Sequence, residues 1–509
     1  MCSSDLPRKK TAFSIGSFPN SKIRRWERTS KTVDQNLIVI MSDEHQSRAM
    51  SGLGHFVKTP NLDAMMTAGT TFTNAYTPSP ICVPARASFA TGHYAHRLRL
   101  WDNAMPYAGQ FPSWGHALQG AGIAVESIGK LHYRDPTDDN GFDAHHLPMM
   151  VIDGVGMVWG SVRDEAQRIS PPSRMLGDTI GAGSSKYTEY DQAVTDTTIQ
   201  WLQARDRNTP FCLYVGLVAP HFPLVAPPAF YELYSGMDMA EPKLSSDPVF
   251  RNHPWIERLD AQMPTEDHFT SPEERRAAIV AYFALVSWLD HNVGKILSSL
   301  DATGLAENTT VIYASDHGDN VGARRLWGKS NFYEESAAVP LIATGAGFAA
   351  GEVVSTPVSL IDLSATIPAH FGLALNEEAL GAPPGQDLRA IAQQPHDADR
   401  VVFSEYHAVG AVSGGFMVRK GDWKYIHYLG FEPELFDLAN DPEETINLAG
   451  QPQVAKKQAE LHAELLEICD PEATNAQAFA DQRALIARYG GLEAALKLGA
   501  PGATPPPGV

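Results

Sequence analysis

The sequence predicts an α/β fold with a mostly parallel central sheet. Short apolar runs rich in β-branched residues alternate along the chain with stretches that carry helix signals, which is typical of strand–helix–strand units. The first run, "NLIVIMSDEH", has the composition of a buried parallel strand and ends in acidic residues. We expect further strands at "IAVESIG", "FCLYVGLVAP", "TTVIYASD" and "VPLIATG".

Helix signals lie between these strands. In "TPNLDAMMTAG", Thr59 is the expected N-cap, Pro60 the first helical residue and Gly69 the stop. The stretch "FPSWGHALQGAG" predicts a second helix, and a long helix is expected from about Pro272 to Leu300. The alternation therefore favours a sheet flanked by helices.

The pattern changes near residue 395. The segments "VVFSEYH", "GGFMVRKGDWKYIHYL" and "PELFDLANDP" alternate apolar and polar residues, which predicts a small antiparallel sheet, and a helix is expected around Val454 to Cys469. We divide the chain into a basic polar N-terminal extension (1–35), a main α/β domain (36–390), an antiparallel-sheet subdomain (391–470) and a C-terminal arm (471–509).

Composition excludes several classes of function. The net charge of −19 disfavours a nucleic-acid or anionic-membrane binder, and no apolar run approaches the roughly 18 residues that a membrane span needs. The basic N-terminal extension lacks the apolar core of a signal peptide, so we expect a flexible arm on a cytoplasmic protein. The four cysteines are far apart and show no CxxC spacing, which argues against a disulfide framework or structural zinc.

Polar residues collect where the predicted strands end. Ligands of open α/β sheets bind outside the carboxyl ends of the strands. Those ends, and the turns just after them, carry Asp43, Glu44, Lys130, His132, His221, Asp316, His317 and Lys329, and a separate turn carries Cys82 and Arg86. Taken singly, such residues have ordinary roles, since an acid caps a helix, a lysine is solvated and a cysteine is a small buried hydrophobe.

The joint pattern points to chemistry. Carboxylates with a histidine suit a hard divalent cation, while lysines, histidines and an arginine suit an anion with several oxygens. Cys82 beside Arg86 supplies a candidate nucleophile. Gly318, after the Asp316–His317 pair, would let the backbone approach a ligand closely.

The segment "CVPARASFATG" matches the signature C-x-P-S/A-R-x-x-x-x-T-G of the type I sulfatases. With "LIVIMSDEH", "SIGKLHY", "APHFPL", "YASDHGDNVG", "LWGKSNFYEESAAVPLI" and "ELFDLANDPEETINLA", the chain resembles this formylglycine-dependent family of the alkaline phosphatase superfamily over nearly its whole length. Within it, the sequence is similar to choline-sulfatase-like sulfatases and to phosphonate monoester hydrolases. The resemblance implies an alkaline-phosphatase-like sandwich with a smaller C-terminal antiparallel sheet.

The resemblance also implies how the site works. A formylglycine-generating enzyme would oxidise Cys82 to Cα-formylglycine, whose hydrate attacks sulfur with one hydroxyl and later expels sulfate as the carbonyl re-forms. Asp43, Asp316 and His317 would bind one divalent metal, with Glu44 as a further candidate ligand. We expect Ca²⁺, with Mn²⁺ or Mg²⁺ as alternatives.

The remaining site residues receive roles from the same resemblance. Arg86 and Lys130 would hold the formylglycine diol and its oxyanion, and His132 would take the proton that triggers sulfate release. Lys329 and His221 would contact the sulfate and the leaving oxygen, one of them as general acid. Relatives assemble through C-terminal segments, so the arm after Asp470 predicts a homodimer or homotetramer.

Three functions follow from these residues. The first is a sulfuric ester hydrolase for small aryl or alkyl sulfate monoesters, promiscuous toward phosphonate and phosphate esters. The alternative is a phosphonate monoester or phosphodiester hydrolase that uses the same aldehyde, because both kinds of substrate are tetrahedral oxyanion esters. The third is a non-catalytic metal-binding protein with an unmodified Cys82. For none of these three functions do we expect a nucleic-acid or membrane partner.

Overall fold

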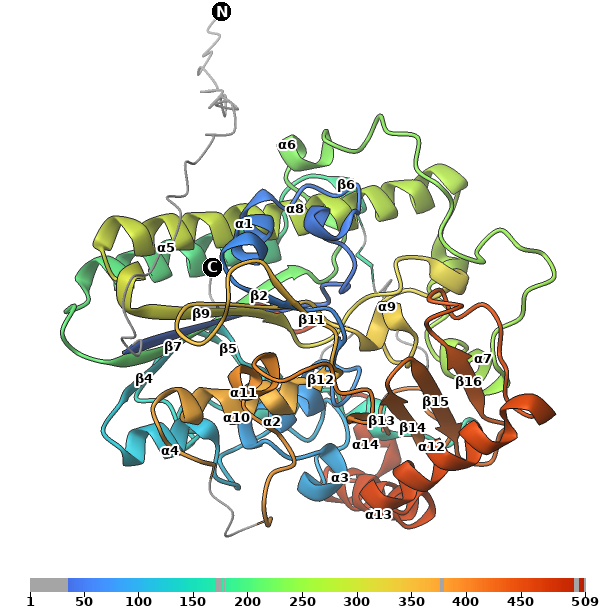
Figure 1. Cartoon of the computed structure of the whole chain (residues 1–509). Helices are drawn as coiled ribbons and strands as arrows, with labels where there is room; N and C mark the ends of the chain where they lie inside the picture. The colour runs from blue at the N-terminus through green and yellow to red at the C-terminus, as the bar shows by residue number, and fades with distance from the viewer. Residues whose placement is uncertain (1–34, 170–175, 178, 376–379, 499–502, 508–509) are drawn as a thin grey trace, which may run out of the picture.

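The computed structural model describes residues 35–169, 176–177, 179–375, 380–498 and 503–507 (Figure 1). The predicted N-terminal extension, 1–35, lies outside the described residues except for its last position. None of the described helices is long and apolar enough to cross a membrane.

An eight-stranded sheet, in the order β11-β2-β10-β9-β1-β7-β4-β5, forms the centre of the fold. Its strands are β1 (Asn36–Asp43), β2 (Thr70–Phe72), β4 (Ala124–Lys130), β5 (Ala144–Met149), β7 (Phe211–Pro220), β9 (Thr309–Ser315), β10 (Leu341–Thr344) and β11 (Glu352–Val354). Strand β1 pairs in parallel with both β7 and β9. Strand β10 runs antiparallel to both of its neighbours. The sheet is still mostly parallel, and the prediction is confirmed.

Helices cover both faces of this sheet (Figure 1). One layer holds α1 (Pro60–Ala68), α5 (Lys186–Ala204) and α8 (Pro272–Thr303). The other holds α2 (Cys82–Thr91), α4 (Trp114–Gly120) and α10 (Leu360–His370). The predicted sandwich is therefore confirmed.

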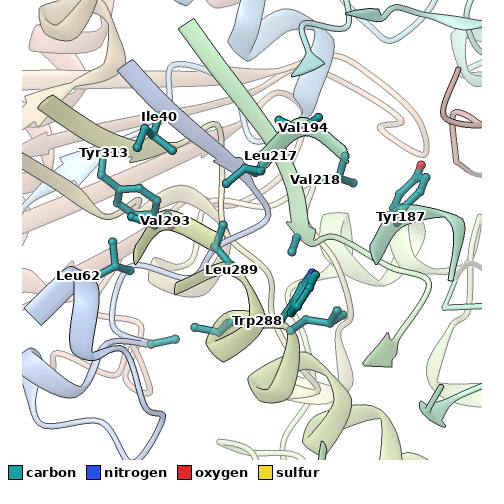
Figure 2. Close-up of a cluster of buried hydrophobic side chains, with 14 of the residues drawn as sticks. Ile40, Leu62, Tyr187, Val194, Leu217, Val218, Trp288, Leu289, Val293 and Tyr313 are labelled. Atoms are coloured by element: carbon teal, nitrogen blue, oxygen red, sulfur yellow. The ribbon is translucent and has the colours of Figure 1, made fainter. Parts of the chain in front are cut away.

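Successive side chains of β1 enter opposite layers, as the two-residue period of a strand requires. Ile38 and Ile40 belong to the hydrophobic cluster on the α8 side, whereas Leu37 and Val39 belong to the cluster on the α2 side. Figure 2 shows the α8-side cluster, in which Ile40 lies near Tyr313 and faces side chains of α8. Burial on both faces explains why this strand is a continuous apolar run.

The long helix α8 begins and ends at clear signals. The Ser271 side chain accepts a hydrogen bond from the backbone of Glu274, Pro272 occupies the first turn, and Gly304 ends the helix at φ 71°. Helix α1 also starts at the predicted Pro60, although the hydroxyl of Thr59 donates to Asp63 and does not cap the helix.

A four-stranded antiparallel sheet forms the C-terminal part, as predicted. It consists of β13 (Val401–Tyr406), β14 (Gly415–Lys420), β15 (Trp423–Tyr428) and β16 (Glu434–Asp437). Helix α12 (Ala455–Ile468) packs on it through Leu461 and Leu465, and is followed by α13 (Pro471–Arg488) and α14 (Leu492–Ala495). The domain boundaries at 390 and 470 stay predictions.

The remaining short elements connect these layers. They are β3 (Ala75–Tyr76), β6 (Gly181–Ala182), β8 (Val225–Ala226), β12 (Val358–Ser359), α3 (Ala95–Leu98), α6 (Pro228–Tyr231), α7 (Pro254–Asp260), α9 (Glu334–Ala337) and α11 (Leu388–Ala392).

Candidate active site

Four neighbouring strands bring the predicted site residues to one edge of the sheet. Asp43 ends β1 and Lys130 ends β4, while His221 follows the last residue of β7. Asp316 and His317 follow β9 directly. Because β9, β1, β7 and β4 are adjacent and parallel, their carboxyl ends meet, as the sequence predicts.

Cys82 is the first residue of α2 and is buried at this edge. Its Sγ lies 3.1 Å from Nε2 of His317, 3.3 Å from Nζ of Lys329 and 3.6 Å from Oδ1 of Asp43. Cys82 thus lies at the N-terminal end of α2, where the helix dipole favours negative charge. The predicted nucleophile thus lies between a cation, a carboxylate and an imidazole.

Arg86 lies one helical turn after Cys82 and is fully surrounded by acceptors. Its guanidinium donates to Asp316 at 2.8 Å, to Asp43 at 3.1 Å and to the hydroxyl of Tyr214 at 2.8 Å. Nζ of Lys130 pairs with the same Asp43 at 2.6 Å. Arg86 and Lys130 therefore fix the orientation of Asp43, beside the position where the resemblance places the diol.

The carboxylates and His317 form a compact donor set. One potential ligand atom from each of Asp43, Cys82, Asp316 and His317 lies within 4.8 Å of all the others. Asp43, Glu44 and His221 form a second group of this kind. Oε2 of Glu44 is buried and receives no hydrogen bond within the described part of the chain. An orphaned buried carboxylate oxygen beside this set fits a hard divalent cation.

The charges at the site stabilise one another. Burial alone would raise the pKa of Asp43, but Lys130, His221 and Arg86 outweigh it and hold that pKa well below its usual range. Burial would likewise lower the pKa of Lys329, but the neighbouring Cys82, Glu44 and Asp43 hold it well above the usual value. Lys329 is therefore positively charged and Asp43 negatively charged at neutral pH.

His221 and His132 are neutral at the site. Burial lowers the pKa of His221 well below its ordinary value, and Lys329 and Lys130 add to the effect. Burial and the charges of Lys130 and Arg86 lower the pKa of His132 in the same way. Nδ1 of His221 lies 2.6 Å from the carbonyl oxygen of Phe222, so this nitrogen carries the hydrogen. The lone pair on Nε2 of His221 is left free for the site.

Burial also raises the pKa of the Cys82 thiol to about 12, with the charge of Asp43 adding to the shift. A thiol in this setting is protonated at neutral pH.

Left-handed backbone conformations gather at the site. Glu44 has φ 68°, His132 has φ 57° and Ser330, next to Lys329, has φ 82°. Each such conformation in a residue with a side chain costs on the order of 1–3 kcal/mol and is typical of functional sites. The surrounding structure therefore holds these side chains in positions that relaxed backbone would not give them.

Gly318 is required where two backbone segments meet. A Cβ atom at this position would lie 2.1 Å from the carbonyl oxygen of Glu335. This packing holds His317 at the end of β9. The expected approach of this backbone to a ligand stays a prediction.

A cavity of about 70 Å³ opens beside Cys82. Its lining includes Cys82, His221 and Lys329 and the apolar residues Met157, Trp159 and Trp327. The lining therefore offers polar groups next to the nucleophile position and apolar surface for the rest of a ligand.

Two further residues support the site. Oδ1 of Asn103 accepts a hydrogen bond from the backbone of Val83 and anchors the start of α2. Asp319, in the quoted segment "YASDHGDNVG", accepts hydrogen bonds from the backbone of Val321 and Gly328 and so holds the loop before Lys329. The acid three residues after Asp316 was a usable signal in the sequence for Asp319.

The mostly parallel sandwich is consistent with the fold of the alkaline phosphatase superfamily, and the comparisons with known proteins agree. The sulfatase family model matches residues 35–373, and a model described as N-sulphoglucosamine sulphohydrolase, C-terminal, matches residues 322–470. The chain belongs to the sulfatase family and is an enzyme of that family.

Individual relatives agree with this assignment. A choline-sulfatase of Rhizobium meliloti (strain 1021) is 34% identical over 441 residues, covering 84% of this chain and 85% of the relative. Arylsulfatase K of Danio rerio is 31% identical over 441 residues, covering 82% and 80%. The phosphonate monoester hydrolase of Agrobacterium radiobacter has the same fold, with a TM-score of 0.66 at 22% identity over 85% of this chain and 95% of that chain.

Proposed function

We propose that this sulfatase hydrolyses small aryl or alkyl sulfate monoesters at the Cys82 edge of the sheet. The observation that carries the proposal is the contact of Cys82 with both His317 and Lys329 beside a compact carboxylate set. A singly charged sulfate ester fits a pocket that holds one charged lysine and a metal-ligand set.

Cys82 is proposed to act as Cα-formylglycine, made by a formylglycine-generating enzyme that reads the "CVPAR" core. A sulfated thiolate would be a thiosulfate-type intermediate with no easy exit. The hydrated aldehyde supplies a hydroxyl for attack at sulfur and a second hydroxyl whose deprotonation expels sulfate. Attack therefore requires the oxygen chemistry of the modified residue.

Asp43, Asp316 and His317, with Glu44, are proposed to hold one divalent ion, for which Ca²⁺ suits the oxygen-rich set and Mn²⁺ or Mg²⁺ are the alternatives. When bound, such an ion offsets negative charge that develops on the sulfuryl oxygens. The orphaned Oε2 of Glu44 supports its inclusion among the ligands.

The surrounding residues would then bind and move protons. Lys329 is charged and touches the Cys82 position, so it suits hydrogen bonding to the sulfate and proton donation to the leaving oxygen. His221 offers a free Nε2 on the same wall of the pocket. His132 is neutral and suits acceptance of the proton that triggers sulfate release. Arg86 and Lys130 are proposed to hold the formylglycine diol and its oxyanion, and both also contact Asp43.

Phosphonate monoester or phosphodiester hydrolysis by the same residues is the alternative. The fold shared with a phosphonate monoester hydrolase favours it, and promiscuity between the two substrates is expected because each carries one negative charge on a tetrahedral group. The test compares kcat/KM for an aryl sulfate and an aryl phenylphosphonate on one preparation. We expect the sulfate to be preferred, and a thousandfold preference for the phosphonate would reverse the order of the two proposals.

We also propose a cytoplasmic homodimer or homotetramer, with the arm after Asp470 at the interface. Part of this arm already packs on its own chain, since Gln482 of α13 donates to Asp102 at 2.9 Å. The remaining exposed face of α13 is what a second copy would cover. Mass in solution of a chain that ends near residue 475, compared with the full chain, tests this assembly.

A further inference from the structure

A buried ion pair of the C-terminal part contacts the loop that carries Lys329. Lys424, on β15, and Glu444, after β16, are both buried, and Nζ of Lys424 lies 2.7 Å from Oε1 of Glu444. Burying two charges costs desolvation energy, so such a pair is by itself weak evidence for stability. The other contacts of the pair therefore decide what it does.

Both members of the pair bind the main chain of one loop, residues 329–333, here called the Lys329 loop, or the residue just after it. Nζ of Lys424 donates a hydrogen bond of 2.7 Å to the carbonyl oxygen of Phe332. Oε2 of Glu444 accepts one of 2.7 Å from the backbone N–H of Glu334, the first residue of α9. The pair thus holds the end of the loop, where β15 lies beside α9 (Figure 1).

The beginning of the Lys329 loop is fixed on the side of the nucleophile. The backbone N–H of Ser330 donates to the carbonyl oxygen of Pro80, two residues before Cys82, at 3.0 Å. Ser330 has φ 82°, a left-handed conformation that persists only where the surrounding structure holds it. The 3.3 Å contact of Lys329 with Cys82 therefore depends on backbone that must be held in place.

Further contacts fix the loop at the C-terminal sheet. Nζ of Lys424 also lies 2.8 Å from Oε1 of Glu334, and the same oxygen accepts a hydrogen bond of 2.6 Å from the hydroxyl of Tyr76. Glu444 itself has φ 51°, and its carbonyl oxygen accepts a hydrogen bond of 2.9 Å from Arg324. The side chain of Glu444 is thus oriented by its own turn as well as by its partners.

Neither Lys424 nor Glu444 is among the residues that line the cavity beside Cys82. Glu444 belongs to the sequence segment "ELFDLANDPEETINLA", which contributes no residue to that lining. An effect of the pair on the reaction is therefore expected to pass through the Lys329 loop and not through contact with the ester.

We propose that the Lys424–Glu444 pair positions the ammonium group of Lys329 for the reaction. Both members act through the main chain of the Lys329 loop, so they are positioning residues. The inference rests on the proposed function, because that function gives Lys329 its contact with the sulfate and the leaving oxygen. It makes the antiparallel C-terminal sheet part of the structure that sets the geometry of the active site.

Glu444→Gln is the test variant, because it keeps the size of the side chain and removes the charge that holds Lys424. We expect kcat to fall at least about tenfold, since misplacement of a reacting group by about 1 Å can cost about 100-fold. The substrate is an aryl sulfate or an aryl phenylphosphonate, whichever the enzyme turns over faster. Rates are divided by the formylglycine and metal content of each preparation. An unchanged kcat would overturn the proposal.

Asp362→Asn is the matched control. Asp362 is a buried carboxylate that accepts hydrogen bonds from the backbone of Ser359 and Gln386. It also pairs with Arg400 at 2.6 Å, so it makes the same kinds of contact as the test residue. None of these four residues lines the active-site cavity. We expect the control to lower the melting temperature and leave kcat unchanged, and an equal fall of kcat in both variants would assign the loss to destabilisation and refute positioning.

A double-mutant cycle shows whether the pair acts through Lys329. Glu444→Gln is combined with Lys329→Met, and kcat is compared with that of each single variant. Without the ammonium group nothing is left to position, so the second substitution should cost little more and the two losses should not multiply. Losses that multiply would show that Glu444 acts independently of Lys329 and would contradict the proposal.

Hydrogen exchange of residues 329–335, followed by mass spectrometry with peptide fragmentation, needs no turnover. The backbone N–H groups of Ser330 and Glu334 are hydrogen-bonded, so both should exchange slowly in the parent. Glu444→Gln should speed exchange at both positions, whereas Asp362→Asn should not. Failure to hydrolyse either ester would remove the proposed function and leave this result standing. Exchange at Ser330 as slow in Glu444→Gln as in the parent would show that the pair does not order the loop near Lys329, and the proposal would be wrong.

Discussion

The side chains of Lys329 and Cys82 meet at 3.3 Å across 247 residues of sequence. Lys329 lies on a loop whose backbone donates a hydrogen bond to Asp319. Cys82 lies in the first turn of α2. A permanently charged donor is thereby fixed at the nucleophile position before any substrate arrives. Such preorganised donors supply much of the rate enhancement of hydrolases.

Lys329→Met removes the charge and shortens the side chain by one heavy atom. We expect kcat to fall roughly 100- to 1000-fold, as for loss of one preorganised donor to developing negative charge. Lys497→Met is the matched control, because Lys497 forms an exposed ion pair with Glu493 and is not among the residues that line the cavity beside Cys82. Steady-state kinetics on an aryl sulfate checks both. A loss below threefold in Lys329→Met would remove Lys329 from the proposed mechanism.

Gly318→Ala tests the backbone packing that holds His317. The new Cβ would lie 2.1 Å from the carbonyl oxygen of Glu335, so the main chain at the end of β9 must shift. We expect a loss of about 1–3 kcal/mol in the free energy of unfolding and weaker metal binding. Gly120→Ala is the control, because a Cβ there meets nothing within 4 Å.

Urea denaturation and metal titration measure both variants. Gly120→Ala should leave stability within about 1 kcal/mol of the parent, since it replaces glycine in a helix. Equal stability and equal metal affinity in Gly318→Ala would mean that the backbone of α9 moves aside without effect on the site.

Acid should destabilise the protein through Glu335. Burial would raise the pKa of Glu335, but Arg324 and Lys243 outweigh it and lower that pKa from 4.5 to about 2. A carboxyl group with a lower pKa in the folded than in the unfolded chain stabilises the fold at pH values above its unfolded pKa. This stabilisation is lost as the pH falls from about 4.5 toward 2. Arg324 Nη1 lies 3.1 Å from the Glu335 carboxylate, so the pair is direct.

Glu335→Gln is expected to lower the free energy of unfolding at pH 7 by about 3–5 kcal/mol, because it leaves a buried guanidinium without its partner. It should also flatten the fall in stability between pH 4.5 and the lowest pH at which the fold survives. Urea midpoints across that range measure both effects. A variant as acid-sensitive as the parent would assign the acid sensitivity to other carboxylates.

Removal of the divalent ion should lower both activity and thermal stability. A ligand that binds only the folded chain adds about 2.7 kcal/mol when present at 100 times its Kd. We expect chelation to lower Tm, and Ca²⁺, Mn²⁺ or Mg²⁺ to restore it in the order of their affinity. Asp316→Asn should abolish the restoration. A chelated protein with full activity and unchanged Tm would exclude a bound ion.

The strands that build the site were predictable because each is a buried apolar run with polar residues at its end. Strands β1, β7 and β9 are of this kind, and the parallel arrangement then brings Asp43, His221 and Asp316 together. Short strands such as β6 and β8 have two residues each and carry no periodic signal.

Helix α5 was missed because its pattern is diluted. Its buried residues include Tyr187, Val194 and Leu202, but threonines interrupt the stripe, and β-branched residues weaken a helix prediction. Contacts between distant residues had no local signal at all. Arg86 with Tyr214 and His132 with Thr504 are contacts of this kind, since only the folded chain shows them.

The mass of the peptide that contains Cys82, taken from active enzyme, tests the central claim most directly. The account predicts a loss of about 18 Da relative to the cysteine peptide, or nearly none if the aldehyde is hydrated, with reactivity toward a carbonyl reagent in either case. It also predicts that Cys82→Ala abolishes turnover. A free thiol at this position in fully active protein, or undiminished turnover in Cys82→Ala, would contradict it.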